Sequence, residues 1–190
     1  NTLIKETSRI IHPGERSQNL LLSSFKGELL QKCPGSHGHI CCNYNVINQY
    51  IGCPIDCSYC ILQSYLNQPF TIINTDTDIL FEHLHKLHEN VGDCKIRIGT
   101  GELGDSLVYD PITDFSEQYI DFFGSHKKFI FEFKTKTNFI GNILACKNPG
   151  NIVIGYSVNP ESITKSEEKN STPLIERLKA AGKKKKKGYM

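Results

Sequence analysis

Short apolar stretches alternate with helix-like stretches along most of this 190-residue chain, and this alternation restricts the fold more than any other feature. The strand-like stretches are 44–51, 70–74, 95–101, 128–136 and 151–158. The helix-like stretches are 57–66, 75–90, 110–124, 138–146 and 172–182, the last one ending at Gly182. A repeated strand–helix order predicts parallel strands joined by crossover helices. We therefore expect an α/β fold.

The two ends of the chain differ from this middle part. Residues 1–43 show little periodicity and contain the turn signals "HPGERS" and "CPGSHGH", so we expect a loop-rich N-terminal extension there. The α/β domain is expected over residues 44–190. The chain stops at "KKGYM", where an apolar segment begins, so we expect this domain to be incomplete, with a truncation at its C-terminus.

Composition excludes some classes of protein. The formal net charge of +2 does not by itself indicate a nucleic-acid binder, and 38% hydrophobic with 22% charged residues is typical of soluble globular proteins. No apolar run approaches the roughly 20 residues that span a bilayer, so we expect no membrane association. The N-terminal residues lack a basic start followed by an apolar run, which predicts a cytoplasmic protein with reduced thiols.

Three of the eight cysteines lie within "GCPIDCSYC", residues 52–60. Cys53, Cys57 and Cys60 have the spacing C-x3-C-x2-C. We expect Cys57 and Cys60 to share one face at the start of the helix over 57–66, with Cys53 in the preceding loop. The three thiols would then point into one small volume.

Two kinds of metal centre fit three thiolates. A structural zinc site needs four ligands, so one more would have to join the three cysteines. The candidates for that ligand are Cys33, Cys41, His37 and His39. The other possibility is a four-iron cluster held by three thiolates, with one iron left open to bind a further molecule.

Polar residues follow the predicted strands at their carboxyl ends, the edge where chemistry collects in parallel α/β folds. These residues are Gly52 and Cys53, Thr100 to Glu102, Lys134 and Lys136, and Ser157 and Asn159. We expect them to converge on the three cysteines.

The segment "GTGELG", residues 99–104, matches the G-x-G-x-x-G pattern of dinucleotide-binding turns. Its context opposes that interpretation, because "DSLVYDP" separates the third glycine from the next helix. Glycines at a strand end also allow a ligand to approach the backbone closely, and we favour that use here.

The cysteine spacing, with Tyr59 before the last cysteine, resembles the cluster motif of the radical S-adenosylmethionine superfamily. A closer resemblance, over about residues 33–190, is to the spore photoproduct lyase family. It rests on "CPGSHGHICCNYNVINQYIGCPIDCSYCILQSYL", "IRIGTGELGDSL", "FEFKTKT", "IVIGYSVNPESI" and "ERLKAA". The resemblance implies a partial (β/α)6 barrel. It also implies a [4Fe-4S] cluster on Cys53, Cys57 and Cys60, whose open iron binds the amino and carboxylate groups of S-adenosylmethionine.

The resemblance also implies a cofactor-binding role for residues at the strand ends. Gly101 would let the methionyl part of the cofactor approach, and Glu102 would accept from its ammonium group. Lys136 matches a family lysine near the methionyl carboxylate, and Ser157 matches a family serine near the cofactor, with Asn159 beside it. The alternatives are a Gly-rich turn in which Glu102 is a helix-capping acid, a solvated strand-end lysine for Lys136 and simple strand-end capping for Ser157.

One part of the family pattern is missing. The family passes the radical through tyrosines on both sides of the third cluster cysteine. Here Tyr59 is present before Cys60 and is our candidate catalytic and cofactor-binding residue, but the residue after Cys60 is Ile61. The family also returns a hydrogen atom from a cysteine in the segment matching residues 97–107, where this chain has Glu102 and no cysteine. Authentic repair of spore photoproduct is therefore not expected.

The resemblance implies an enzyme that forms a 5′-deoxyadenosyl radical, with DNA as a candidate partner and an electron donor such as flavodoxin or ferredoxin. In the family itself the substrate is a methylene-bridged thymine dimer. One alternative is an enzyme of the same family that acts on a substrate other than DNA. Another is a zinc-stabilised module that binds nucleic acid through the lysine run 183–187.

Overall fold

The computed structural model describes residues 19–33, 35, 38, 43–147 and 150–190. The strands in these residues are β1 (Leu20–Ser23), β2 (Gln31–Lys32), β3 (Tyr44–Val46), β4 (Tyr50–Ile51), β5 (Thr71–Asn74), β6 (Ile96–Gly99), β7 (Phe129–Thr135) and β8 (Ile152–Tyr156). The helices are α1 (Leu62–Tyr65), α2 (Thr77–Asn90), α3 (Asp110–Thr113), α4 (Phe115–Ser125), α5 (Gly141–Ala145), α6 (Glu161–Glu167) and α7 (Leu174–Lys186).

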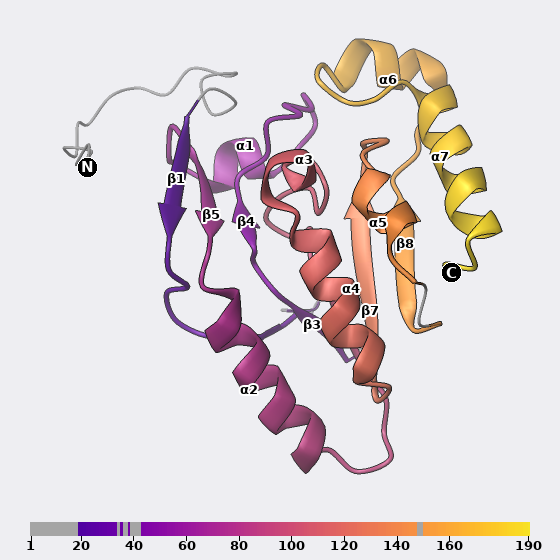
Figure 1. The fold of residues 1–190 in the computed structure, drawn as a ribbon. Coiled ribbons are helices and arrows are strands. Elements are labelled where there is room, and N and C mark those ends of the chain that lie inside the picture. Colours follow the sequence, from indigo (N-terminus) through magenta and orange to yellow (C-terminus); the bar gives the residue numbers. More distant parts are fainter. Residues whose placement is uncertain (1–18, 34, 36–37, 39–42, 148–149) are drawn as a thin grey trace.

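The strands form two sheets, one of three strands in the order β1-β5-β4 and one of five in the order β2-β3-β6-β7-β8 (Figure 1). In the larger sheet β3, β6, β7 and β8 are parallel, as the strand–helix alternation predicts. The pair β1–β5 is parallel as well. The pairs β2–β3 and β4–β5 are antiparallel, which the sequence did not predict. The four parallel strands place their carboxyl ends at one edge.

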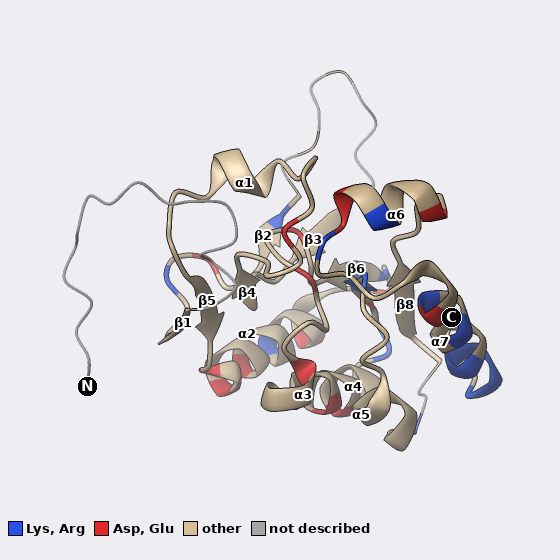
Figure 2. Ribbon diagram, turned by 90° about the horizontal axis from the view of Figure 1, so that it is seen from above, with Lys and Arg blue, Asp and Glu red and all other residues tan. Residues whose placement is uncertain are grey.

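Aromatic side chains pack the helices against the larger sheet. Helices α2 and α4 lie on the same side of the strands (Figures 1 and 2). Alternate residues of β7 are buried, and Phe131 stacks on Phe123 of α4 with 4.1 Å between ring centroids. Phe81 of α2 stacks on Phe122 of α4 at 4.6 Å. Burial of each such side chain stabilises the fold by about 1.5–3 kcal/mol, so these contacts fix α2 and α4 against the larger sheet.

The strand predicted over residues 44–51 is wrong in one respect, because the chain crosses from one sheet to the other within it. β3 belongs to the larger sheet and β4 to the smaller one. The crossing is stabilised by Gln49, whose buried amide donates to the carbonyl of Asn74 and accepts from the hydroxyl of Tyr119. A polar side chain buried with its partners can thus fix a bend inside an apolar stretch.

The helix predicted over residues 57–66 is also wrong at its start, since α1 covers only residues 62–65. Cys57 forms an antiparallel bridge with Glu168, and the amide of Ser58 donates to the carbonyl of Glu167 at 2.9 Å. These bonds to a distant segment replace the first helical turn. Cys57 and Cys60 therefore lie in turns before the helix.

Two other predicted helices have different ends. The helix over 110–124 is divided into α3 and α4 at Asp114, which has a left-handed φ of 53°, while Asp110 accepts from the amide of Ser116 at 2.8 Å. The last helix continues through Gly182 to Lys186, and Gly188, with φ 88°, follows its end instead. Helix α6 was not predicted.

The predicted N-terminal extension contains two short strands among its described residues, β1 and β2, which pair with β5 and β3. At the other end, Lys183 to Lys186 lie in the last turn of α7, where Figure 2 shows positive residues. The backbone of Met190 bonds to Ile152 and Ile154 of β8. No helix in the described part of the chain is both long and apolar enough to cross a membrane.

Candidate functional site

The three clustered cysteines lie on the loop between β4 and α1, and all three line one cavity of about 210 Å³. Gly101 and Glu102, after β6, line the same cavity. So do Lys136, after β7, and Ser157, after β8. The residues after β6, β7 and β8 meet because these parallel strands end at a common edge. The cysteine loop follows β4 of the smaller sheet and joins them from there.

Tyr59 also lines the cavity, whereas Asn159 does not line it and instead contacts Tyr59. The Asn159 amide donates to the Tyr59 hydroxyl at 2.9 Å, and the Lys136 ammonium donates to the same hydroxyl. The Lys136 nitrogen also lies over the Tyr59 ring, 4.8 Å from its centre. Lys136 is therefore held against the cysteine loop and is not the solvated strand-end lysine of the alternative interpretation.

The backbone at Gly101 has a conformation and a packing that only glycine allows. Its φ is 97°, and a Cβ there would lie 2.7 Å from the Ser106 hydroxyl oxygen and 3.2 Å from the Lys134 carbonyl oxygen. Glycine is therefore required here by the packing of the chain against itself, and the approach of a ligand to this backbone stays a prediction. No helix begins at the third glycine, since α3 starts at Asp110, so the dinucleotide-binding interpretation has no support.

Asp105 lines the cavity and was not singled out in the sequence. Its buried carboxylate accepts from the amide of Lys136 at 2.6 Å and from the hydroxyl of Thr135 at 2.8 Å. Burial raises the pKa of Asp105, and these donors oppose that rise. The carboxylate fixes the backbone from which the Lys136 side chain projects.

Glu168 is the second residue that the sequence did not reveal. It lies just after α6, is 2% exposed, and its Oε1 accepts from Lys136 at 2.6 Å and from Asn159 at 2.8 Å. The same oxygen accepts from the Tyr59 hydroxyl. Its Oε2 pairs with Arg177 of α7, which is 0% exposed. One carboxylate therefore joins the cysteine loop, the β7 strand end and α7.

The pKa of the Glu168 carboxyl reflects these contacts. Burial alone would raise it, but hydrogen bonds from Lys136, Tyr59, Arg177 and Asn159 hold the pKa at about 2. For Lys136, burial alone would lower the pKa. The hydrogen bonds from Lys136 to Glu168 and Tyr59 outweigh that effect, so the pKa of Lys136 is raised. The pair is therefore fully charged at neutral pH.

Burial raises the pKa of the Cys53 thiol to about 12, and the nearby charge of Asp105 adds to this rise. Burial also raises the pKa of Cys57. Both groups are thiols at neutral pH in the protein alone, and a bound metal would deprotonate them.

The donor set fits an iron–sulfur cluster, whose usual ligands are cysteine thiolates. Three free cysteines on one cavity offer three such ligands. Within the described residues, no three His, Cys, Asp or Glu side chains form a group that could hold a metal ion in the present geometry. Some adjustment of the thiols on loading is therefore required, through a change of side-chain rotamer.

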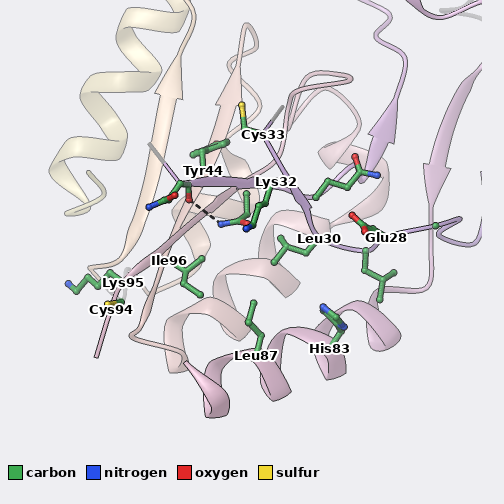
Figure 3. A pocket seen from close by; sticks show the side chains of 15 residues that line it. Glu28, Leu30, Lys32, Cys33, Tyr44, His83, Leu87, Cys94, Lys95 and Ile96 are labelled. Carbon is green, nitrogen blue, oxygen red and sulfur yellow. Dashed lines mark hydrogen bonds between the residues drawn. The ribbon is translucent and has the colours of Figure 1, made fainter. Parts of the chain in front are cut away.

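Of the four candidates for a fourth zinc ligand, Cys33 is the one that lies within the described residues, and it does not line the cavity of the three cysteines. Cys33 lines a second cavity of about 1120 Å³, together with Tyr44, His83 and Cys94 (Figure 3). Cys41, Cys42, His37 and His39 lie outside the described residues. None of the predicted cluster or cofactor residues, all of which are described, lines the second cavity.

Comparison with known proteins agrees with the sequence resemblance. The family model "Spore photoproduct lyase" matches residues 40–190. The spore photoproduct lyase of Bacillus subtilis (strain 168) is 25% identical over 139 residues, which are 73% of this chain and 41% of that protein. The Clostridium acetobutylicum enzyme is 25% identical over 132 residues, 68% of this chain and 39% of its own length. The chain thus spans less than half the length of these relatives.

Solved structures share the fold. Spore photoproduct lyase complexed with dinucleoside spore photoproduct superposes with a TM-score of 0.79 at 21% identity, over 91% of this chain and 49% of that one. A variant of that enzyme with bound AdoMet and the same dinucleoside gives the same values. At this identity the likeness establishes the mixed α/β fold.

Proposed function

The chain belongs to the spore photoproduct lyase family, and from this premise we propose that it is a radical S-adenosylmethionine enzyme. In this proposal Cys53, Cys57 and Cys60 hold a [4Fe-4S] cluster, and S-adenosylmethionine binds against the neighbouring strand ends. When bound and reduced, such a cluster supplies the electron that cleaves the sulfonium to a 5′-deoxyadenosyl radical. The protein's own part is to bind, orient and shield.

One observation carries the proposal: three thiols share a cavity with the Lys136 side chain. The Lys136 ammonium is held there by the Glu168 carboxylate, which also pairs with Arg177. A ligand carboxylate on this cavity would be attracted to that ammonium, which supports placing the methionyl carboxylate there.

The other site residues receive roles from their positions on the cavity. Glu102 would accept from the methionyl ammonium, and the bare backbone at Gly101 would allow the ligand to approach. Ser157 and Asn159 would orient the ligand at the end of β8. Tyr59, beside the cysteines, would contact the cofactor and take part in hydrogen transfer.

The finer fold and the partners also belong to this proposal. We infer a partial (β/α)6 barrel over residues 44–190, preceded by an extension over 1–43. The substrate class that we carry over from the named relatives is the spore photoproduct, a thymine lesion in DNA, and the missing donor cysteine favours another hydrogen donor or another substrate of the same family. A flavodoxin or ferredoxin would supply the reducing electron. A zinc-stabilised binding module has no supporting observation among the described residues.

Anaerobic reconstitution of the full chain with iron and sulfide tests this function. We expect stoichiometric iron and acid-labile sulfide, and 5′-deoxyadenosine after addition of S-adenosylmethionine and a reductant. Cys57→Ala should lose the cluster, while Cys94→Ala, an exposed cysteine on the second cavity, should keep it. Stoichiometric zinc without sulfide, or normal iron in Cys57→Ala, would refute the assignment.

A further inference from the structure

The segment at the end of α6 and just after it forms hydrogen bonds and an ion pair with the cysteine loop. The amide of Asn170 donates to the carbonyl of Ile55 at 3.1 Å, and its side chain donates to the carbonyl of Pro54 at 2.9 Å. Lys169 pairs with Asp56 at 3.2 Å. Residues 167–170 therefore act as a clamp on the loop that carries the three cysteines.

Within this clamp, two adjacent glutamates have different surroundings. Glu167 accepts from the Ser58 hydroxyl, at an exposed position. Glu168 points inward, where Lys136 and Arg177 pair with its two oxygens. Both residues bond to the cysteine loop, but Lys136 forms its ion pair with Glu168.

The orientation of Lys136 depends on that pair. A lysine side chain has four rotatable bonds and a point charge, so its ammonium takes a fixed position only where partners hold it. Here the partners are the Glu168 carboxylate and the Tyr59 hydroxyl. The carboxylate is fixed in turn by Arg177, whose Nε and Nη1 donate to the carbonyls of Thr172 at 2.6 Å and Ser157 at 2.8 Å.

We propose that Glu168 is a positioning residue: it holds the Lys136 ammonium beside the cysteine loop, where that ammonium can pair with the carboxylate of the bound S-adenosylmethionine. This inference rests on the proposed function and goes beyond it by naming the group that fixes the carboxylate-binding lysine. Glu168 acts through Lys136 and not by touching the reacting atoms. Supporting partners of this kind alter ligand affinity even though they do not contact the ligand.

The test compares Glu168→Gln with the matched control Glu167→Gln in the full, anaerobically reconstituted chain. The dissociation constants of two ligands are measured by equilibrium dialysis: S-adenosylmethionine, which has the carboxylate, and 5′-methylthioadenosine, which lacks it. Glu168→Gln should weaken S-adenosylmethionine binding about 10- to 100-fold and leave 5′-methylthioadenosine within about twofold. Glu167→Gln should change neither constant by more than about twofold.

A double variant shows whether the effect passes through Lys136. With Lys136→Met present, adding Glu168→Gln should cause no further loss of S-adenosylmethionine affinity, because the group it positions is absent. If Glu168→Gln does not fold, Glu168→Asp replaces it: this change keeps a charge near Arg177 and withdraws the carboxylate from Lys136.

Three outcomes would overturn the inference: unchanged S-adenosylmethionine affinity in the Glu168 variant, an equal loss for both ligands, or additive losses with Lys136→Met. Iron and sulfide content is measured on every sample. A wild-type chain with a full cluster and no affinity for S-adenosylmethionine would instead overturn the proposed function.

Discussion

The buried Glu168 carboxylate should stabilise the folded chain in a pH-dependent way. The change to test is Glu168→Gln, which removes the charge and keeps nearly the same shape. In the folded protein this carboxyl is 2% exposed and its pKa is held at about 2, below the ordinary value of 4.5. The variant leaves Arg177 charged and buried without its counter-ion.

The size of the effect follows from the pKa. Each pKa unit corresponds to about 1.4 kcal/mol, so a fall from 4.5 to about 2 corresponds to about 3 kcal/mol of unfolding free energy. Loss of one partner from a buried ion pair costs a similar amount, about 3–5 kcal/mol. We therefore expect Glu168→Gln to lower the free energy of unfolding by about 3 kcal/mol at pH 7.

The pH dependence has a definite sign. The folded-state pKa is lower than the unfolded one, so the stabilisation is complete above pH 4.5 and is lost as the pH falls toward 2. The difference between wild type and variant should thus shrink to about half near pH 3.

Urea unfolding of the metal-free chain, followed by circular dichroism at several pH values, measures this difference. Glu167→Gln is the control, with no expected change because that carboxylate is exposed. Adding Arg177→Met to Glu168→Gln should recover at least about half of the loss, since it removes the unpaired buried charge. A difference below about 1 kcal/mol at pH 7, or one that grows in acid, would refute this reasoning.

Four further predictions concern the site, its frame and the reaction. Lys136→Ala should weaken S-adenosylmethionine binding roughly 10- to 100-fold without loss of iron; unchanged affinity would return Lys136 to a structural role. Gly99→Ala should lower the free energy of unfolding in urea by about 1–3 kcal/mol, because the new Cβ would lie 1.8 Å from the hydroxyl oxygen of Tyr44, which donates to Glu132. Gly182→Ala has open space around it and should instead raise the free energy of unfolding by about 0.5–1 kcal/mol, because alanine favours the helix α7. With a lesion-containing dinucleotide, we expect chromatography to show 5′-deoxyadenosine in clear excess over repaired thymine.

The general location of the site could be predicted from the sequence. Parallel strands put their carboxyl ends at one edge, so Gly101, Lys136 and Ser157 had to meet if the strands before them were assigned correctly. The cavity that these three residues share in the structure agrees with that argument. Cys53 follows β4 of the smaller sheet, so this argument does not account for its position. For the other three, a strand assignment accurate to one or two residues was sufficient.

The contacts that hold the site could not be predicted in this way. Glu167 and Glu168 are neighbours in the polar run "TKSEEKN", and no local pattern shows which one is buried. That difference arises from Arg177, which lies on another helix. The same holds for Gln49, whose burial and partners reveal the crossing between sheets, and for Cys57, whose pairing with Glu168 delays the start of α1. Each depends on a partner remote in the chain.

The expected excess of 5′-deoxyadenosine over repaired thymine follows from the groups on the cavity. A carbon radical left on the substrate needs a hydrogen atom from a weak bond, which a thiol supplies. Among the described residues, the thiols that line the cavity are those of Cys53, Cys57 and Cys60, and all three are assigned to the cluster. Glu102, where the family resemblance leads one to expect a thiol, has no such hydrogen to give. Efficient and clean return to two thymines would refute this argument and require another donor.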